Sequence, residues 1–215
     1  MSNKKAVVLL SGGLDSAVTL YLAKSRKFDC RALIFNYGQR HRREIEAAKS
    51  VAKAAGVKFE VIKISLPWKG SSLLDKRSIS RSKSSSIPDT YVPARNIIFL
   101  SFALSFAESL GAAAIFIGAH SQDYSGYPDC RPEFFRAFDK VASCGTKAGV
   151  ENKGIEIKTP LINMGKAEII RLGGRLKVPF ELTWSCYKGG KQPCGVCDSC
   201  YYRNKGFREA GIEQI

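Results

Sequence analysis

The chain lacks any hydrophobic run that could span a membrane, because none approaches the ~20 consecutive apolar residues of a transmembrane helix. Its N-terminus also lacks the long apolar core of a secretion signal, since Lys4 and Lys5 lead directly into a short strand-like run. These absences predict a cytoplasmic protein with no membrane partner.

Acidic residues are scarce. The chain has 19 Asp and Glu against 34 Lys and Arg, which gives a formal net charge of +15. Such a balance favours anionic partners, either nucleic acid or small substrates such as ATP and carboxylates. Because the basic residues are scattered, with one denser patch at Lys76–Lys83, we favour the small substrates over nucleic acid. The Ser- and Lys-rich segment 69–86 is interpreted as a solvated loop, with a basic lid over a triphosphate as the alternative.

Internal repeats are absent, and 215 residues with 45% hydrophobic content predict a single domain over 1–215. Strand-like runs alternate with helical segments. This pattern predicts a Rossmann-like, doubly wound α/β fold with a parallel sheet of about five strands. The expected strands are Ala6–Leu10, Cys30–Asn36, Phe59–Ile64, Ala113–Gly118 and Ile155–Thr159. The expected helices are Ser16–Ser25, Arg42–Ala55, Ile97–Leu110, Glu133–Cys144 and Lys166–Leu176.

Neither of the common nucleotide motifs, Gly-x-x-x-x-Gly-Lys-Ser/Thr and Gly-x-Gly-x-x-Gly, describes the turn after the first expected strand. That turn is Ser-Gly-Gly-Leu-Asp-Ser at Ser11–Ser16, followed by a helix. Two glycines and a helix N-terminus suit the binding of phosphate oxygens. The motif resembles the pyrophosphate-binding loop of the ATP pyrophosphatase (PP-loop) superfamily. The resemblance implies ATP binding by Leu10, Ser11, Gly12, Gly13, Leu14, Asp15, Ser16 and Ala17.

Polar loops follow four of the expected strands, at the edge where open parallel sheets bind ligands. Asp15 is expected to cap the helix or hold Mg²⁺, and Ser16 is the other candidate cap. Lys166, at the start of the last expected helix, is expected to reach phosphate from the opposite side. Asp15 and Lys166 are therefore the predicted catalytic residues.

Seven cysteines without a secretion signal do not indicate a disulfide framework. Cys186, Cys194, Cys197 and Cys200 have metal-ligand spacing, and nearby glycines let the chain wrap around an ion. Four thiolates close a tetrahedral shell, so the segment 183–204 is predicted to hold one structural zinc, with an iron–sulfur cluster as the alternative. Loss of this metal should lower the stability and solubility of the protein before it affects catalysis. Two other cysteines, Cys30 and Cys144, are expected to be buried.

The loops Tyr91–Asn96 and Gly118–Phe134 supply arginines, carboxylates and aromatic rings that suit a planar substrate with a carboxylate. Together with Ser11–Ser16 and the cysteine segment, they resemble the 7-cyano-7-deazaguanine synthase (QueC) family over nearly the whole chain. The block Gly126–Pro132 and the cysteines are the most specific parts of this resemblance. The resemblance implies substrate binding by Arg95, Asn96, Asp123, Asp129 and Arg131.

The same resemblance implies an ATP-dependent carbon–nitrogen ligase of queuosine precursor biosynthesis. It would convert 7-carboxy-7-deazaguanine and ammonia to the nitrile through an adenylated carboxylate and an amide, and we expect a homodimer. Two alternatives remain at this point. One is a PP-loop enzyme that thiolates or otherwise modifies tRNA, and the other is a zinc-ribbon module that binds nucleic acid without catalysis.

Overall fold

The computed structural model describes residues 3–39, 42–68, 71–74, 87–121 and 126–213. Its centre is a sheet of five parallel strands in the order β3-β2-β1-β4-β5. The strands are β1 Lys5–Leu9, β2 Asp29–Asn36, β3 Lys58–Lys63, β4 Ala114–Phe116 and β5 Glu156–Lys158. The strand order changes direction between β1 and β4, so a ligand crevice is expected beyond the carboxyl ends of these two strands.

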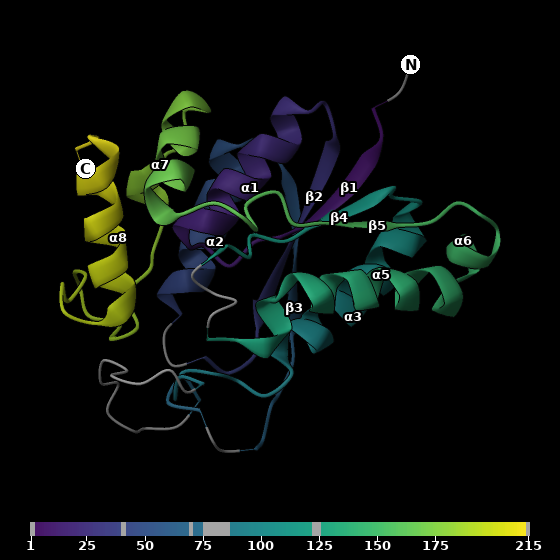
Figure 1. Ribbon diagram of the computed structural model, residues 1–215, viewed down its shortest axis with the longest axis horizontal. Coiled ribbons are helices and arrows are strands. Elements are labelled where there is room, and N and C mark those ends of the chain that lie inside the picture. The colour runs from purple at the N-terminus through teal and green to yellow at the C-terminus, as the bar shows by residue number, and fades with distance from the viewer. Residues whose placement is uncertain (1–2, 40–41, 69–70, 75–86, 122–125, 214–215) are drawn as a thin grey trace.

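Helices cover both faces of the sheet, as the alternating pattern predicts. The first face packs against α1 (Leu14–Ser25), α2 (Arg43–Ala54) and α7 (Lys166–Arg175). The second packs against α3 (Arg95–Leu110) and α5 (Pro132–Gly145), and α5 is followed by the short α6 (Lys147–Val150). In Figure 1, α3 and α5 lie together on one side of the strands, while α8 (Asp198–Ala210) stands beside α7. The remaining helical turns are η1 (Pro128–Cys130) and η2 (Phe180–Leu182).

The residues of β1 explain why both faces are covered. Side chains alternate along a strand, so Ala6 and Val8 join the core under α1, while Val7 and Leu9 join the core under α3. Because Ala6, Val7 and Val8 are completely buried, this strand is the middle of the molecule. Its end therefore presents the next residues to the sheet edge at a well-defined position.

The expected strands and helices all exist, and every predicted end lies within two residues of the observed one. Sequence patterns missed α8, because its core-facing residues include the polar Arg203 and the small Gly206 beside Phe207. The prediction for Cys30 is confirmed, since its side chain is buried, but the prediction for Cys144 is wrong because this residue is exposed near the end of α5. Among the described residues, no helix is long and apolar enough to cross a membrane.

Candidate active site

The loop of residues 10–17, which the sequence predicts to bind phosphate and which is called the PP-loop below, leads from β1 into α1. Hydrogen bonds made by its own hydroxyl groups hold it in shape. The Ser11 hydroxyl donates a 3.0 Å hydrogen bond to Ser16 Oγ, and the Ser16 hydroxyl donates one of 2.9 Å to the Gly13 carbonyl. The helix begins at Leu14 with Gly13 as its N-cap, and no side chain caps it within the described chain. The expectation that Asp15 or Ser16 caps the helix is therefore wrong. An uncapped helix N-terminus offers its N–H groups and positive dipole end to an anion.

Gly12 allows this loop to lie directly against α2. Its φ of +86° belongs to the left-handed region, and a Cβ atom there would lie 2.2 Å from the Glu44 carbonyl oxygen. Only glycine satisfies both conditions. The first turn of α2 is thus held in contact with the PP-loop.

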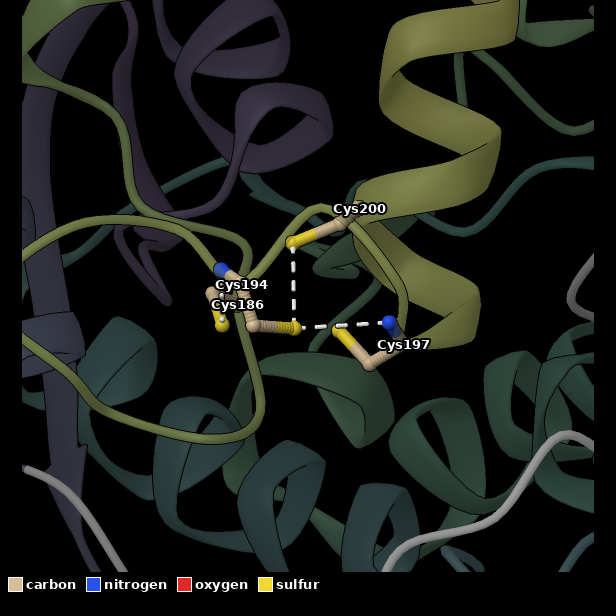
Figure 2. A group of neighbouring side chains, drawn as sticks. All are labelled: Cys186, Cys194, Cys197 and Cys200. Carbon is tan, nitrogen blue, oxygen red and sulfur yellow. Dashed lines mark hydrogen bonds between the residues drawn. The ribbon is translucent and has the colours of Figure 1, made fainter.

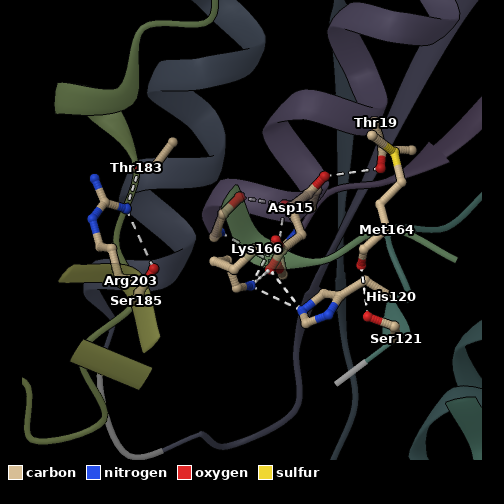
Figure 3. A network of polar contacts seen from close by, with 12 residues as sticks. Asp15, Thr19, His120, Ser121, Met164, Lys166, Thr183, Ser185 and Arg203 are labelled. Carbon is tan, nitrogen blue, oxygen red and sulfur yellow. Dashed lines mark hydrogen bonds and ion pairs between the residues drawn. The ribbon is translucent and has the colours of Figure 1, made fainter. Parts of the chain in front are cut away.

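Asp15, Lys166 and His120 meet at the carboxyl edge of the sheet (Figure 3). Lys166 Nζ lies 2.8 Å from Asp15 Oδ1, 2.9 Å from Asp15 Oδ2 and 2.9 Å from His120 Nε2. Burial raises the pKa of the Asp15 carboxyl, but Lys166 and His120 lower it by more, so the pKa lies well below its ordinary value. The two residues predicted to be catalytic therefore form an ion pair in which Asp15 is fully ionised.

Sequence reasoning singled out the loop that holds His120 but gave this residue no role. His120 follows β4, and its side chain is 5% exposed and lies 3.6 Å from Asp15 Oδ2. Its neighbour Gly118 passes so close to Asp15 that a Cβ atom would approach the Asp15 backbone to 3.0 Å. The available signal was its position in the sequence, because a histidine in the loop after a strand that neighbours β1 is expected to lie near the PP-loop.

A cavity of about 270 Å³ opens beside the PP-loop and lies against the ends of β1, β2 and β4. Its apolar wall comes from the strands and α3, and its polar groups come from the PP-loop, α2 and the cysteine segment. The apolar side chains include Leu33, Phe35, Phe99 and Ile117, and the polar ones include Ser11, Asp15, Tyr37, Glu44, Arg95 and Ser185. Apolar and aromatic walls with a few polar groups suit a planar heterocycle.

Arg95 brings a cation to this cavity at the start of α3. Its guanidinium donates a 3.4 Å hydrogen bond to the Tyr37 hydroxyl and lies 5.9 Å from the centre of that ring. Burial lowers the pKa of Arg95, but Tyr37 and other neighbours raise it by more, so the side chain stays charged. A charged guanidinium in a partly apolar cavity is suited to binding a carboxylate.

Asn96 and Asp129 contact each other. The Asp129 carboxylate accepts a 2.9 Å hydrogen bond from the Asn96 backbone N–H, and the Asn96 amide donates to the Asp129 carbonyl at 3.0 Å and to Cys130 Sγ at 3.1 Å. Both residues are buried, at 8% and 6% exposure. The pair joins η1 to the first turn of α3, where the carboxylate also suits the helix dipole.

Of the residues that the sequence predicts to bind substrate, some line the cavity and others do not. Arg95 and Asn96 line the cavity, whereas Asp129 is buried against Asn96 without lining it and Arg131 is exposed at the N-terminus of α5. Asp123 lies outside the described residues.

The four predicted metal ligands form one cluster (Figure 2). The sulfur atoms of Cys186, Cys194, Cys197 and Cys200 all lie within 4.8 Å of one another. Backbone N–H groups of Lys188 and Cys194 point at Cys186 Sγ from 3.4 and 3.3 Å, an arrangement that stabilises thiolate. A tetrahedral ion with bonds of about 2.3 Å to sulfur requires sulfurs about 3.8 Å apart, so the cluster fits such an ion.

The cysteine segment also forms part of the cavity wall. The Trp184 backbone N–H donates a 2.9 Å hydrogen bond to the Gly12 carbonyl, and the Trp184 indole N–H donates one of 2.9 Å to the Cys186 carbonyl. The buried Arg203 of α8 donates to Thr183 Oγ1 at 2.7 Å and to Ser185 Oγ at 3.4 Å (Figure 3). Sequence reasoning treated the metal segment as separate from the chemistry, whereas the segment lies against the PP-loop.

A second, larger hollow of about 610 Å³ lies along α8. Its lining includes Tyr201, Asn204, Arg208 and Ile212. None of the predicted catalytic, substrate or metal residues lines it. Asp15, Arg95 and Asn96 instead line the 270 Å³ cavity.

A family model and similar sequences agree on one family. The family model described as queuosine biosynthesis protein QueC matches residues 5–211. The 7-cyano-7-deazaguanine synthase of Thermoplasma acidophilum is 52% identical over 99% of this chain and 91% of its own length. The 7-cyano-7-deazaguanine synthase 2 of Desulfitobacterium hafniense is 54% identical over 98% of this chain and 91% of its own. A solved NMN synthetase from Francisella tularensis has a similar fold, with a TM-score of 0.53 and 13% identity over 100% of this chain and 89% of that one.

Proposed function

The chain belongs to the QueC family of queuosine biosynthesis proteins, and from this membership we propose that it is an ATP-dependent 7-cyano-7-deazaguanine synthase. The reaction takes 7-carboxy-7-deazaguanine, ammonia and ATP to the nitrile. The observation that carries the proposal is the match over nearly the full chain to relatives of that name, together with the PP-loop beside the cavity.

ATP phosphates are proposed to bind at the uncapped N-terminus of α1, through the backbone and hydroxyl groups of residues 10–17. Asp15 is the residue that would hold Mg²⁺, whose charge would offset that of the triphosphate. Lys166 is proposed to exchange its contact with Asp15 for one with the departing pyrophosphate. This exchange keeps the lysine charge at the place where negative charge develops.

The deazapurine is proposed to lie against the apolar wall of the cavity, with its carboxylate toward Arg95. Asn96, Asp129, Asp123 and Arg131 remain proposed substrate residues. For Asn96 and Asp129, the contacts between them support an indirect contribution, in which they hold Arg95 at the start of α3.

Carboxylate oxygen is a poor leaving group, so the acid must first be activated. Attack of this oxygen on the α-phosphorus of ATP releases pyrophosphate and forms an acyl-adenylate. Ammonia then displaces AMP and gives the amide. A second ATP activates the amide oxygen, and loss of AMP with two protons leaves the nitrile. The same cavity is proposed to serve both activations.

The cysteine cluster is proposed to hold one zinc ion with a structural role. Zinc would tie Cys186 to the start of α8 and so stabilise the wall that carries Trp184 and Ser185.

We further propose that the protein is a homodimer in the cytoplasm and acts on small molecules alone. In this proposal, residues 1–215 form one PP-loop domain with its zinc segment at 183–204.

The test is pyrophosphate and AMP release from ATP with each acceptor, combined with mass analysis of the product and elemental analysis of the metal. We expect turnover with 7-carboxy-7-deazaguanine and ammonia, a nitrile product and one zinc per chain. Turnover stimulated by unmodified tRNA, and not by the deazapurine acid, would instead indicate a tRNA-modifying enzyme. Iron with acid-labile sulfide would contradict the zinc assignment.

A further inference from the structure

Glu44 is a carboxylate in the active-site cavity that no sequence motif indicated. It lies in the first turn of α2, and its side chain lines the cavity together with the PP-loop, Tyr37 and Arg95. Within the described parts of the chain, the Glu44 carboxylate makes no hydrogen bond and no ion pair within 4.0 Å. Its neighbour on the same helix, Glu46, instead pairs with Lys49 at 2.8 Å and is 67% exposed.

The position of Glu44 relative to the phosphate site is fixed by backbone packing. A Cβ atom added at Gly12 would lie only 2.2 Å from the Glu44 carbonyl oxygen, so the backbone at Glu44 packs directly against the PP-loop. The residue therefore sits on a rigid helix in contact with the loop at which adenylation is proposed. Such a position suits a group that must act on the atoms of the activated intermediate.

Its surroundings keep the carboxyl able to gain and lose a proton. Burial raises the pKa of Glu44 to about 7, although Arg95 opposes this rise. Asp15 behaves differently, because Lys166 and His120 hold it ionised. The other titratable groups around the cavity are Tyr37, Arg95, Tyr127, Cys130 and Tyr187.

Nitrogen must lose protons in two steps of the proposed reaction. When ammonia attacks the acyl-adenylate, a C–N bond forms, the C–O bond to AMP breaks, and the ammonium nitrogen must lose a proton to give the neutral amide. After O-adenylation of the amide, the nitrogen loses both of its protons, its electron pairs complete the triple bond, and AMP departs with the C–O pair. Pyrophosphate release alone requires no proton transfer from nitrogen.

We propose that Glu44 is the general base that accepts these nitrogen protons in the amide-forming and nitrile-forming steps, an inference that rests on the proposed function. Between steps, the carboxylic acid returns its proton to solvent at the open side of the cavity. Adenylation of the acid should not depend on this residue.

The experiment compares wild type with Glu44→Gln, Glu44→Asp and, as a matched control on the same helix turn, Glu46→Gln. Exchange of labelled pyrophosphate into ATP, driven by the deazapurine acid without ammonia, reports adenylation. Amide formation is followed with ammonia present, and nitrile formation is followed from the amide supplied directly. Thermal unfolding and circular dichroism verify that each variant is folded.

We expect Glu44→Gln to keep exchange within about 3-fold and to lose amide and nitrile formation by roughly 100- to 10,000-fold. The wild-type kcat should fall as pH decreases through about 7, because the base becomes protonated. Glu44→Asp should recover part of the rate and keep this acidic limb, and Glu46→Gln should match wild type.

Loss of exchange together with amide formation would assign Glu44 to substrate binding and overturn the inference. It is equally overturned if Glu44→Gln makes amide within a few-fold of wild type, or if a folded Glu44→Gln keeps the acidic limb. If wild type itself shows no exchange driven by the deazapurine acid, the proposed function fails and the inference fails with it. That outcome is distinct because it appears before any substitution is made.

Discussion

The backbone N–H of Trp184 donates a 2.9 Å hydrogen bond to the carbonyl oxygen of Gly12. This bond joins the cysteine segment to the PP-loop between residues 172 positions apart in the chain. The guanidinium of Arg43 lies 4.9 Å from the centre of the Trp184 ring and also donates to the Lys191 carbonyl at 2.7 Å. The metal site and the phosphate site therefore share one structural wall.

Cys197→Ser should destabilise the protein by more than the roughly 0.5–3 kcal/mol of an ordinary substitution, because an incomplete thiolate shell cannot hold the metal. We expect a lower zinc content, a lower Tm and, because of the bond between Trp184 and Gly12, a higher KM for ATP. Elemental analysis, calorimetry and steady-state kinetics test these three effects. Cys144→Ser, at an exposed position, is the control and should change none of them. Full zinc occupancy in Cys197→Ser would contradict the ligand assignment.

Asp15→Asn should reduce adenylation at least about 1,000-fold, because the variant loses the carboxylate beside Lys166 and the proposed Mg²⁺ ligand. The readout is pyrophosphate exchange driven by the deazapurine acid. A variant that forms product at the wild-type rate would remove Asp15 from the phosphate site.

The same carboxylate makes stability depend on pH. Because the folded pKa of Asp15 is depressed, its contribution to stability is present above the ordinary value of 3.8 and is lost as pH falls toward the folded pKa. We expect the difference in unfolding free energy between wild type and Asp15→Asn, measured with urea, to shrink between pH 5 and pH 3. A difference that stays constant over this range would show that Asp15 has no depressed pKa.

Gly206→Ala should shift Lys166. A Cβ atom at Gly206 would lie 2.5 Å from Lys166 Cγ and 2.9 Å from Ile170 Cδ1, so α8 and α7 would have to separate. Overpacking of this kind costs about 1–3 kcal/mol. We expect a lower unfolding free energy in urea and a lower kcat for adenylation. Gly145→Ala is the control, because nothing lies within 4 Å of its added Cβ.

Arg95→Ala should raise the KM for the deazapurine acid more than about 10-fold and leave the KM for ATP within about 2-fold, because Arg95 is proposed to bind the carboxylate of the acid and is given no contact with the phosphates. Arg131→Ala provides the comparison, since the sequence predicts a substrate role for this exposed residue. A larger increase from Arg131→Ala than from Arg95→Ala would indicate that the acid binds near the N-terminus of α5.

The amino-acid sequence by itself determined the order of the five strands and of the helices that cover the sheet, the PP-loop and the metal ligands, but not α8. Each of these depends on residues close together in the chain. Apolar runs such as Ala6–Leu10 specify a buried strand, and the glycines of Ser11–Ser16 specify a tight phosphate turn. The spacing from Cys194 to Cys200 already permits chelation, because a short flexible segment can wrap around an ion.

Only the tertiary structure decided which polar residues act together. Asp15 and Lys166 are 151 positions apart and meet because parallel strands bring their carboxyl ends to one edge. No short-range pattern distinguishes Glu44 in the cavity from Glu46 in solvent, since both occupy the first turn of one helix. Likewise, the contacts between Asn96 and Asp129 and between Trp184 and Gly12 arise from the packing of distant segments. Local periodicity encodes elements, whereas the partners of a charged or polar group depend on how those elements stack.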